Sequence, residues 1–382
     1  MDGSRWREWG AVAVGYAVLT VALSWPLAAH PASTVLSDSP DTHLFMWTLG
    51  WDVHAFLHRP WALFDANIYY PQAATLAYSE NLIGTAVFAA PVLWLTHNPV
   101  LALNLVSLLS AWLCALGACV LGRELGLSRP AAILAGLVYG FTPARFLRLD
   151  QLHLTTLQWI PWCLAALQRY LQTGSRGALR LALAAFTLQV LSSGHGAVFV
   201  GLAVIVVLGV RVVCGEPWRL SQRLRDVGAV GVALLAPAVL LFAPYLRVQR
   251  EVGLRRSLEN WAINAESFLA SPAHLHERVL GWLHVSRVNE VAGSYLFPGW
   301  LPSLLGLIGV AVTLAMTARY AVADRARLRA SPGPAFVLLT LVSVWLAVGA
   351  RWSLWPLVYW LPGLNFVLSL IHISEPTRPE RI

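Results

Sequence analysis

The sequence predicts an all-α protein, a polytopic transmembrane helical bundle of about 10–11 helices. Of its 382 residues, 57% are hydrophobic and only 12% are charged, whereas soluble domains carry about 25% charged residues. Long apolar runs such as 10–28 and 196–213 contain almost nothing ionisable. A bilayer crossing needs about 20 apolar residues, and its backbone must satisfy its own hydrogen bonds as a helix. These features exclude a large soluble α-protein.

Apolar runs bounded by polar or charged residues define the expected helices. They are 10–28, 82–96, 99–121, 131–146, 155–171, 179–193, 196–213, 227–246, 297–318, 334–350 and 352–368. Two long polar segments, 29–81 and 247–296, interrupt them. We expect residues 1–370 to form one membrane module with these segments as its first and second outer loops.

The net charge of +8 comes from arginine, since the chain contains no lysine. Most arginines flank apolar runs, as the positive-inside rule predicts for a membrane protein, so we exclude a nucleic-acid partner. The clusters within 5–7, 169–180, 211–225 and 319–329 are predicted to be cytoplasmic. This predicts a multi-pass protein of the bacterial cytoplasmic (inner) membrane with a cytoplasmic N-terminus.

If every predicted helix crosses the membrane, the side on which residue 81 lies depends on where the count begins. Counted from the N-terminus, residue 81 lies outside; counted back from Arg169, it lies inside. Either segment 82–96, which is short and interrupted by Pro91, does not fully cross, or part of 41–58 does.

The last twelve residues, 371–382, read IHISEPTRPERI and follow an apolar segment directly. They resemble a sequencing-adapter read-through, so we expect a non-native tail; a genuine short polar tail is the alternative. The four cysteines form no CxxC pair and lie in or beside apolar runs, where they are expected to pack as small apolar side chains.

The first outer loop carries the carboxylates that are candidates for chemistry. They are Asp38, Asp41, Asp52, Asp65 and Glu80. Carboxylates beside a membrane are costly and need a reason. The alternative for Asp41 is structural, because Ser39, Pro40 and Asp41 form an N-cap pattern that places an acid on the helix dipole.

Segment 41–58 has an amphipathic pattern. One face carries Phe45, Leu49, Val53, Phe56 and Leu57, and another carries Asp41, Thr48 and Asp52. Such a helix can lie in the membrane interface with its tryptophans at headgroup depth. We expect its polar face to form the floor of a site open to the outer aqueous phase. His43, His54 and His58 match no strong metal signature and are expected to be interfacial polar residues.

Two further groups of polar residues are candidate binding elements. Where a predicted helix meets the outer surface, the chain carries Arg145, Arg148 and His153, followed by Gln158. Arginine matches phosphate geometry, but snorkelling to the interface is an equal alternative. The second outer loop begins with a basic group that includes Arg250 and Arg255. An outward basic group needs an anionic partner, either lipid headgroups or a lipid-linked phosphate.

Several blocks together resemble a bacterial polytopic family related to GT-C class glycosyltransferases. They are Asp41…Trp47…Trp51, LFDANIYYP (63–71), TLAYSENLIG (75–84), FTPARFLRLDQLHLTTLQWIPW (141–162), PYLRVQRE (244–251) and YLFPG (295–299). In that class an acidic residue after the first helix acts on the acceptor or coordinates a metal. The donor is a sugar on a polyprenyl phosphate or pyrophosphate, and transfer inverts the anomeric centre.

By position, the resemblance implies Asp41 as the first and Asp38 as the second catalytic candidate. It implies substrate-binding roles for Glu80, Arg145, Arg148, His153, Gln158, Arg250 and Arg255. The spacing Asp38-x-x-Asp41 leaves the choice of base and the need for a divalent metal open, and no other cofactor is expected.

The resulting hypothesis is a membrane-embedded glycosyltransferase. Its partners would be a polyprenyl-linked sugar donor, membrane lipid, and an extracytoplasmic glycan, lipid or protein acceptor. The alternatives are a transporter or lipid flippase, and an inactive scaffold in envelope assembly. Transporters place ionisable groups within the membrane and often contain repeats; here the acids lie in a loop and no repeat is evident.

Overall fold

The computed structural model describes residues 3–214, 220–252, 264–285, 287–292, 294–347 and 355–358. Within these ranges the chain forms helices and short 3-10 turns, and no strand occurs. The predicted all-α class is therefore confirmed. The predicted tail, Arg255 and most of the predicted helix 352–368 lie outside the described residues.

The first half of the chain forms ten helices. They are α1 Gly3–Leu23, α2 Pro40–His58, α3 Ile83–Thr96, α4 Pro99–Glu124, α5 Arg129–Phe141, α6 Pro143–Phe146, α7 Leu152–Thr155, α8 Trp159–Thr173, α9 Arg176–Ser192 and α10 Gly194–Val213. The second half contributes further helices within the described ranges. They are α11 Leu220–Val230, α12 Val232–Val252, α13 His274–Trp282, α14 Val288–Val291, α15 Trp300–Ala323, α16 Arg325–Ala330, α17 Gly333–Ala347 and α18 Trp355–Val358.

Most predicted segments coincide with one helix, but two are divided. Segment 131–146 becomes α5 and α6, because Thr142 adopts an extended ψ of 137° before Pro143, as residues before proline usually do. Segment 227–246 is divided between α11 and α12, which meet around Gly231. The predicted helix 155–171 starts four residues later, at Trp159, because α7 and a turn precede it.

Four helices in the described part of the chain, α4, α10, α12 and α15, are long and apolar enough to cross a membrane. Helices α3 and α17 are apolar but shorter. At about 1.5 Å per residue, the 14 residues of α3 span about 21 Å, less than the ~30 Å hydrocarbon core. This length favours the alternative in which 82–96 does not fully cross.

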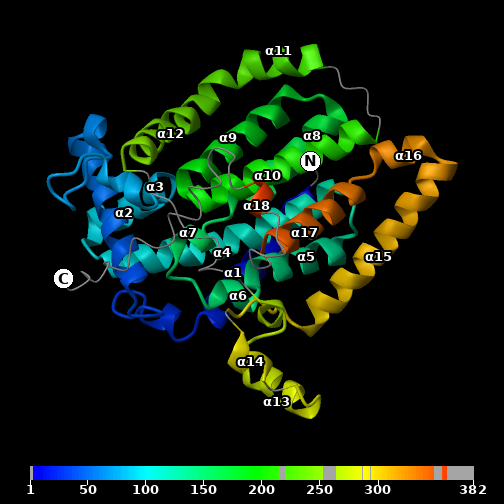
Figure 1. Ribbon diagram of the computed structural model, residues 1–382, viewed down its shortest axis with the longest axis horizontal. Coiled ribbons are helices and arrows are strands. Elements are labelled where there is room, and N and C mark those ends of the chain that lie inside the picture. Colours follow the sequence, from blue (N-terminus) through cyan, green and yellow to red (C-terminus); the bar gives the residue numbers. More distant parts are fainter. Residues whose placement is uncertain are drawn as a thin grey trace.

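Helix α4 lies at the centre of the bundle. It packs against α1, α2, α3, α5 and α8, while α9 packs against α3, α8, α10 and α12. In Figure 1, α2 and α3 lie at one end of this bundle, α15 follows another edge, and α13 and α14 project from it. No residue of α15 is buried, so this apolar helix presents its surface outward.

The close contact between α4 and α5 depends on small residues. Gly136 and Gly140 are four residues apart on α5, the spacing that allows membrane helices to approach closely. A Cβ atom on Gly140 would lie 2.6 Å from the Cβ and 3.0 Å from the backbone nitrogen of Ala115 on α4. The two backbones therefore fix this distance, and a side chain at position 140 must push the helices apart.

Gly140→Ala is expected to destabilise the protein by about 1–3 kcal/mol, the usual cost of overpacking. The matched control is Gly201→Ala on α10, where an added Cβ meets nothing within 4 Å, so no loss is expected. Thermal unfolding of both purified variants in detergent checks the prediction. Equal melting temperatures would contradict the proposed close packing.

Helix α2 is seated on α3 and α4. Its N-terminus forms as predicted: the Ser39 hydroxyl accepts a hydrogen bond from the Thr42 backbone N–H at 3.2 Å, and Pro40 occupies the first turn. Phe45, Leu49 and Val53 enter a core that includes Leu82 and Leu103.

The predicted exposure of α2 was wrong in part. Thr48 and Asp52 are buried rather than open to the aqueous phase. The reason is that two helices cover α2, so its buried arc is wider than one apolar stripe. Asp41, at the edge of this arc, remains half-buried.

Candidate functional site

Two groups of polar residues lie around α2. We name the first the outer carboxylate site, after the predicted outer loop that contains Asp41; it consists of Asp41, Thr42, Asp150 and Gln151, and Arg148 lies in the same loop as the last two. We name the second the buried acid–histidine cluster; it consists of Asp52, Glu80, His153 and His195. Residues of both groups come from elements far apart in the sequence, which the packing of α2 brings together.

The outer carboxylate site forms where the first turn of α2 meets the loop between α6 and α7. The Gln151 side-chain amide donates to Asp41 Oδ2 at 3.0 Å. The Thr42 hydroxyl lies 2.8 Å from Asp150 Oδ2, to which it donates. Asp41 therefore lies in the first turn of α2, where an acid suits the helix dipole, and also contacts a second element, so the two interpretations from the sequence are compatible.

The environment of Asp41 favours its protonated form. Burial raises the pKa of this carboxyl above its ordinary value, the hydrogen bond from Gln151 lowers it, and the nearby charge of Asp150 raises it. Because Asp41 is only half-buried, a substrate can reach it. A reachable carboxylate with a raised pKa is suited to accept a proton from a hydroxyl group near neutral pH.

Arg148 links the outer carboxylate site to the segment before α15. Its guanidinium donates a short hydrogen bond to the Ser294 hydroxyl. Ser294 is held in turn, because its backbone N–H donates to Ser267 Oγ at 3.2 Å. Arg148 therefore joins the loop between α6 and α7, which also carries Asp150 and Gln151, to the residues that precede α15.

The buried acid–histidine cluster is centred on Glu80, which is 1% exposed. Its Oε1 lies 2.6 Å from His195 Nδ1, and its Oε2 accepts from the Gly194 backbone N–H at 2.5 Å. Burial alone would raise the pKa of Glu80, but the hydrogen bonds and the charges of His195 and His153 hold it below its ordinary value. Glu80 is therefore a buried ionised group whose partner lies at the start of α10.

The other two members are His153, which lies beside this pair, and Asp52, which is buried on α2. The His153 ring lies 5.1 Å from the ring of His195 and 4.9 Å from that of Phe45. Asp52 is fully enclosed, and neither carboxyl oxygen has a hydrogen-bond partner among the described residues. Burial raises the pKa of Asp52 well above its ordinary value.

Arg145 and Gln158 lie apart from both polar groups, around the backbone carbonyl of Thr155. The Arg145 guanidinium donates to this oxygen and lies over the Tyr139 ring, 5.4 Å from its centre. Ser110 Oγ lies 2.8 Å from the same oxygen and 2.7 Å from Gln158 Oε1. Arg145 and Gln158 are buried, so both are held by protein groups, whereas the Arg148 guanidinium bonds to Ser294.

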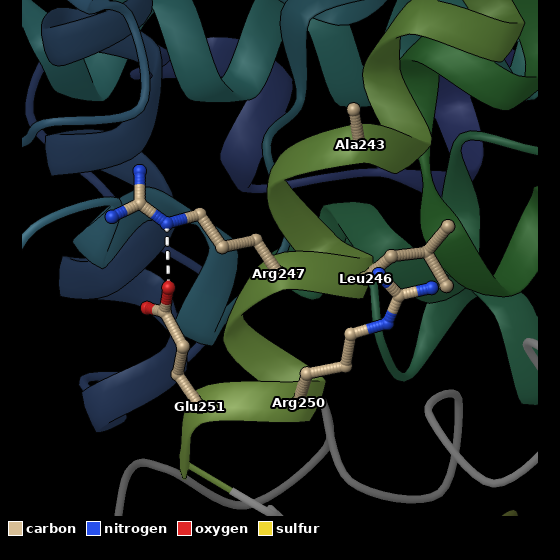
Figure 2. A pocket seen from close by; sticks show the side chains of 5 residues that line it. All are labelled: Ala243, Leu246, Arg247, Arg250 and Glu251. Atoms are coloured by element: carbon tan, nitrogen blue, oxygen red, sulfur yellow. Dashed lines mark hydrogen bonds and ion pairs between the residues drawn. The ribbon is translucent and has the colours of Figure 1, made fainter.

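Arg250 lies on α12 at a shallow pocket of about 360 Å³ lined by Ala243, Leu246, Arg247 and Glu251. Figure 2 shows Arg247 paired with Glu251 on one side of the helix and Arg250 extending past Leu246 on the other. The Arg247–Glu251 distance is 2.8 Å. Arg250 is exposed and available to an anionic group.

Asp38 lies in a different environment from Asp41. Its side chain is 84% exposed and lies 2.7 Å from His43 Nε2. His54 and His58 stack on each other at 4.5 Å along α2. Within the described ranges, no group of three His, Cys, Asp or Glu side chains is arranged to hold a metal ion.

Sequence reasoning did not select His195, Asp150 or Gln151 as site residues, and it named Asp52 only as one of the carboxylates of the first outer loop and as part of the polar face of segment 41–58. His195 stands in the run SSGHGA between two apolar helices, and an ionisable residue in such a place is itself a signal of function. Asp150 and Gln151 follow Arg148 directly, but only the folded loop shows that they face α2.

Comparison with protein-family models, curated proteins and solved structures found no match to this chain. The resemblance to GT-C class enzymes therefore rests on the sequence blocks alone.

Proposed function

We propose that this chain is a membrane-embedded glycosyltransferase of the bacterial inner membrane. It would move a sugar from a polyprenyl-phosphate-type donor to an extracytoplasmic acceptor, with the N-terminus in the cytoplasm and the outer carboxylate site outside. The observation that carries the proposal is the half-buried Asp41, held by Gln151 beside Asp150.

In this proposal Asp41 is the general base. It takes the proton of the acceptor hydroxyl while that oxygen forms a bond to the anomeric carbon of the donor sugar, and the bond to the phosphate oxygen breaks. The phosphate leaves with the electron pair of the broken bond. Arg148, half-buried in the same loop as Asp150 and Gln151, would stabilise the charge that grows on it.

The test is transfer by purified protein in phospholipid vesicles. The donor is a radiolabelled polyprenyl-phosphate sugar, and a bacterial envelope extract supplies the acceptors. Radioactivity that moves from the donor into a product stable to mild acid supports the proposal. Donor that stays intact in the presence of folded protein contradicts it.

The pH dependence of transfer is expected to change when either neighbour of Asp41, Asp150 or Gln151, is replaced. Since the ionised form acts as base, activity should fall as the pH drops through the raised pKa of Asp41. Asp150→Asn removes a charge that raises this pKa, so the acid limb should move to lower pH. Gln151→Leu removes a hydrogen bond that lowers it, so the limb should move to higher pH. Shifts in the same direction would contradict this arrangement.

The buried acid–histidine cluster favours a second candidate, a transporter or lipid flippase. Ionisable side chains enclosed in a membrane protein often mark an ion pathway, and Asp52, Glu80 and His195 are all enclosed. Movement of the intact labelled donor between leaflets, with no sugar transferred, would favour this candidate over the enzyme.

A further inference from the structure

Helix α13 has an apolar face that the protein does not cover. Leu275 and Trp282 are 74% and 79% exposed. They are seven residues apart, almost two helical turns, and so lie on the same face. Leu283 and Val285, just after the helix, are also exposed. The opposite face carries Glu277, which is 54% exposed.

The buried side of α13 is fastened to the beginning of α15. The His276 ring lies 4.4 Å from the Phe297 ring and 5.5 Å from that of Trp300, the first residue of α15. His276 Nε2 also lies 2.6 Å from the Leu269 carbonyl oxygen. Two backbone hydrogen bonds, Leu296 to Ser267 and Phe297 to Ala270, hold the chain on both sides of this contact.

The position of α15 fixes the depth of α13. Helix α15 has 24 residues and is about 36 Å long at 1.5 Å per residue, longer than the ~30 Å hydrocarbon core. None of its residues is buried, as expected for a helix that contacts lipid along its length. When α15 crosses the bilayer, Trp300 lies at the interface, a common depth for tryptophan.

We propose that α13 is an interfacial helix whose Leu275–Trp282 face inserts into the bilayer surface at the Trp300 end of α15. Arg278, exposed beside this face, reaches the lipid phosphates while its stem lies along the apolar region. Helices with one apolar face and one charged face bind membranes in this way.

This contact has a consequence for the outer carboxylate site. The segment between α14 and α15 carries Ser294, which accepts the hydrogen bond from Arg148. A membrane-anchored α13 holds this segment, and through Arg148 the loop that carries Gln151, at the membrane surface. The outer carboxylate site and the headgroups of lipid-linked molecules then lie at the same depth.

The test uses nitroxide labels on single cysteines introduced by Leu275→Cys, Trp282→Cys and Glu277→Cys. The background is Cys214→Ala, because the other three native cysteines are buried. Leu301→Cys, in the first turn of α15 and 58% exposed, gives the reference for lipid. Each protein is reconstituted in phospholipid vesicles, and power-saturation EPR compares collisions with oxygen and with a water-soluble nickel chelate.

Labels at 275 and 282 are expected to collide with oxygen more than with the nickel chelate, like the label at 301. The label at 277 is expected to favour the nickel chelate. Equal access of the chelate to 277 and 282 would overturn the proposal, since the face would then be in water. Low access of both reagents to 275 and 282 would also overturn it, because protein, such as a second copy of the chain, would cover the face.

Discussion

Asp41→Asn is expected to lower sugar transfer by about 10²–10⁴-fold, the usual contribution of a positioned general base. The amide keeps the size of the side chain and can still contact Gln151, but it cannot accept the acceptor proton. The fold should persist, since the helix cap at Ser39 and Thr42 is untouched. Initial rates with saturating labelled donor, together with the melting temperature, check the prediction.

Two other variants test whether the loss of transfer is specific to Asp41. Glu8→Gln replaces an acid paired with Arg129 on the surface and should leave transfer unchanged. Asp38→Asn tests the second candidate from the sequence; because Asp38 is exposed and contacts only His43 among the hydrogen bonds described, a smaller effect is expected. A larger loss from Asp38→Asn than from Asp41→Asn would move the base to Asp38.

Glu80→Ala is expected to destabilise the protein by about 1–3 kcal/mol, the usual cost of leaving buried hydrogen-bonding groups without a partner. The substitution leaves His195 Nδ1 and the Gly194 N–H without their acceptor inside the protein. Glu80→Gln keeps one acceptor oxygen and should lose less. Thermal unfolding in detergent measures both changes.

The matched control is Glu251→Ala, because Glu251 pairs with Arg247 on the surface of α12 and exposed pairs contribute little. The pH dependence gives a second check. The folded pKa of Glu80 lies below its ordinary value, so its stabilisation is present above the ordinary pKa and is lost as the pH falls through the folded pKa. A loss of stability from Glu251→Ala as large as that from Glu80→Ala would contradict the account.

Much of the fold follows from the apolar pattern of the sequence. The start of α2 could be predicted because Ser39 and Pro40 act locally, through one hydrogen bond and one fixed dihedral angle. The break before Pro143 is also local, but an apolar run that continues across it hides the break. The burial of Asp52 could not be predicted, because it depends on α3 and α4 covering two sides of α2.

In the candidate site, too, local features could be predicted from the sequence and contacts between distant segments could not. Asp41 was selected from its place in the first outer loop, and the structure adds a contact with Gln151 from a loop about 110 residues further along the chain. His195 pairs with Glu80 across a similar separation. Such pairs arise from helix packing, and the sequence of either segment alone does not contain them.

The central claim is that sugar transfer takes place at the outer face, at Asp41. Sealed membrane vesicles of known orientation test it most directly, when a labelled sugar on a water-soluble, short-chain polyprenyl phosphate is supplied only from outside. Right-side-out vesicles should transfer the label in a reaction that Asp41→Asn abolishes, and inverted vesicles should transfer little. Transfer confined to inverted vesicles, or intact donor accumulating in the lumen without transfer, would contradict the account.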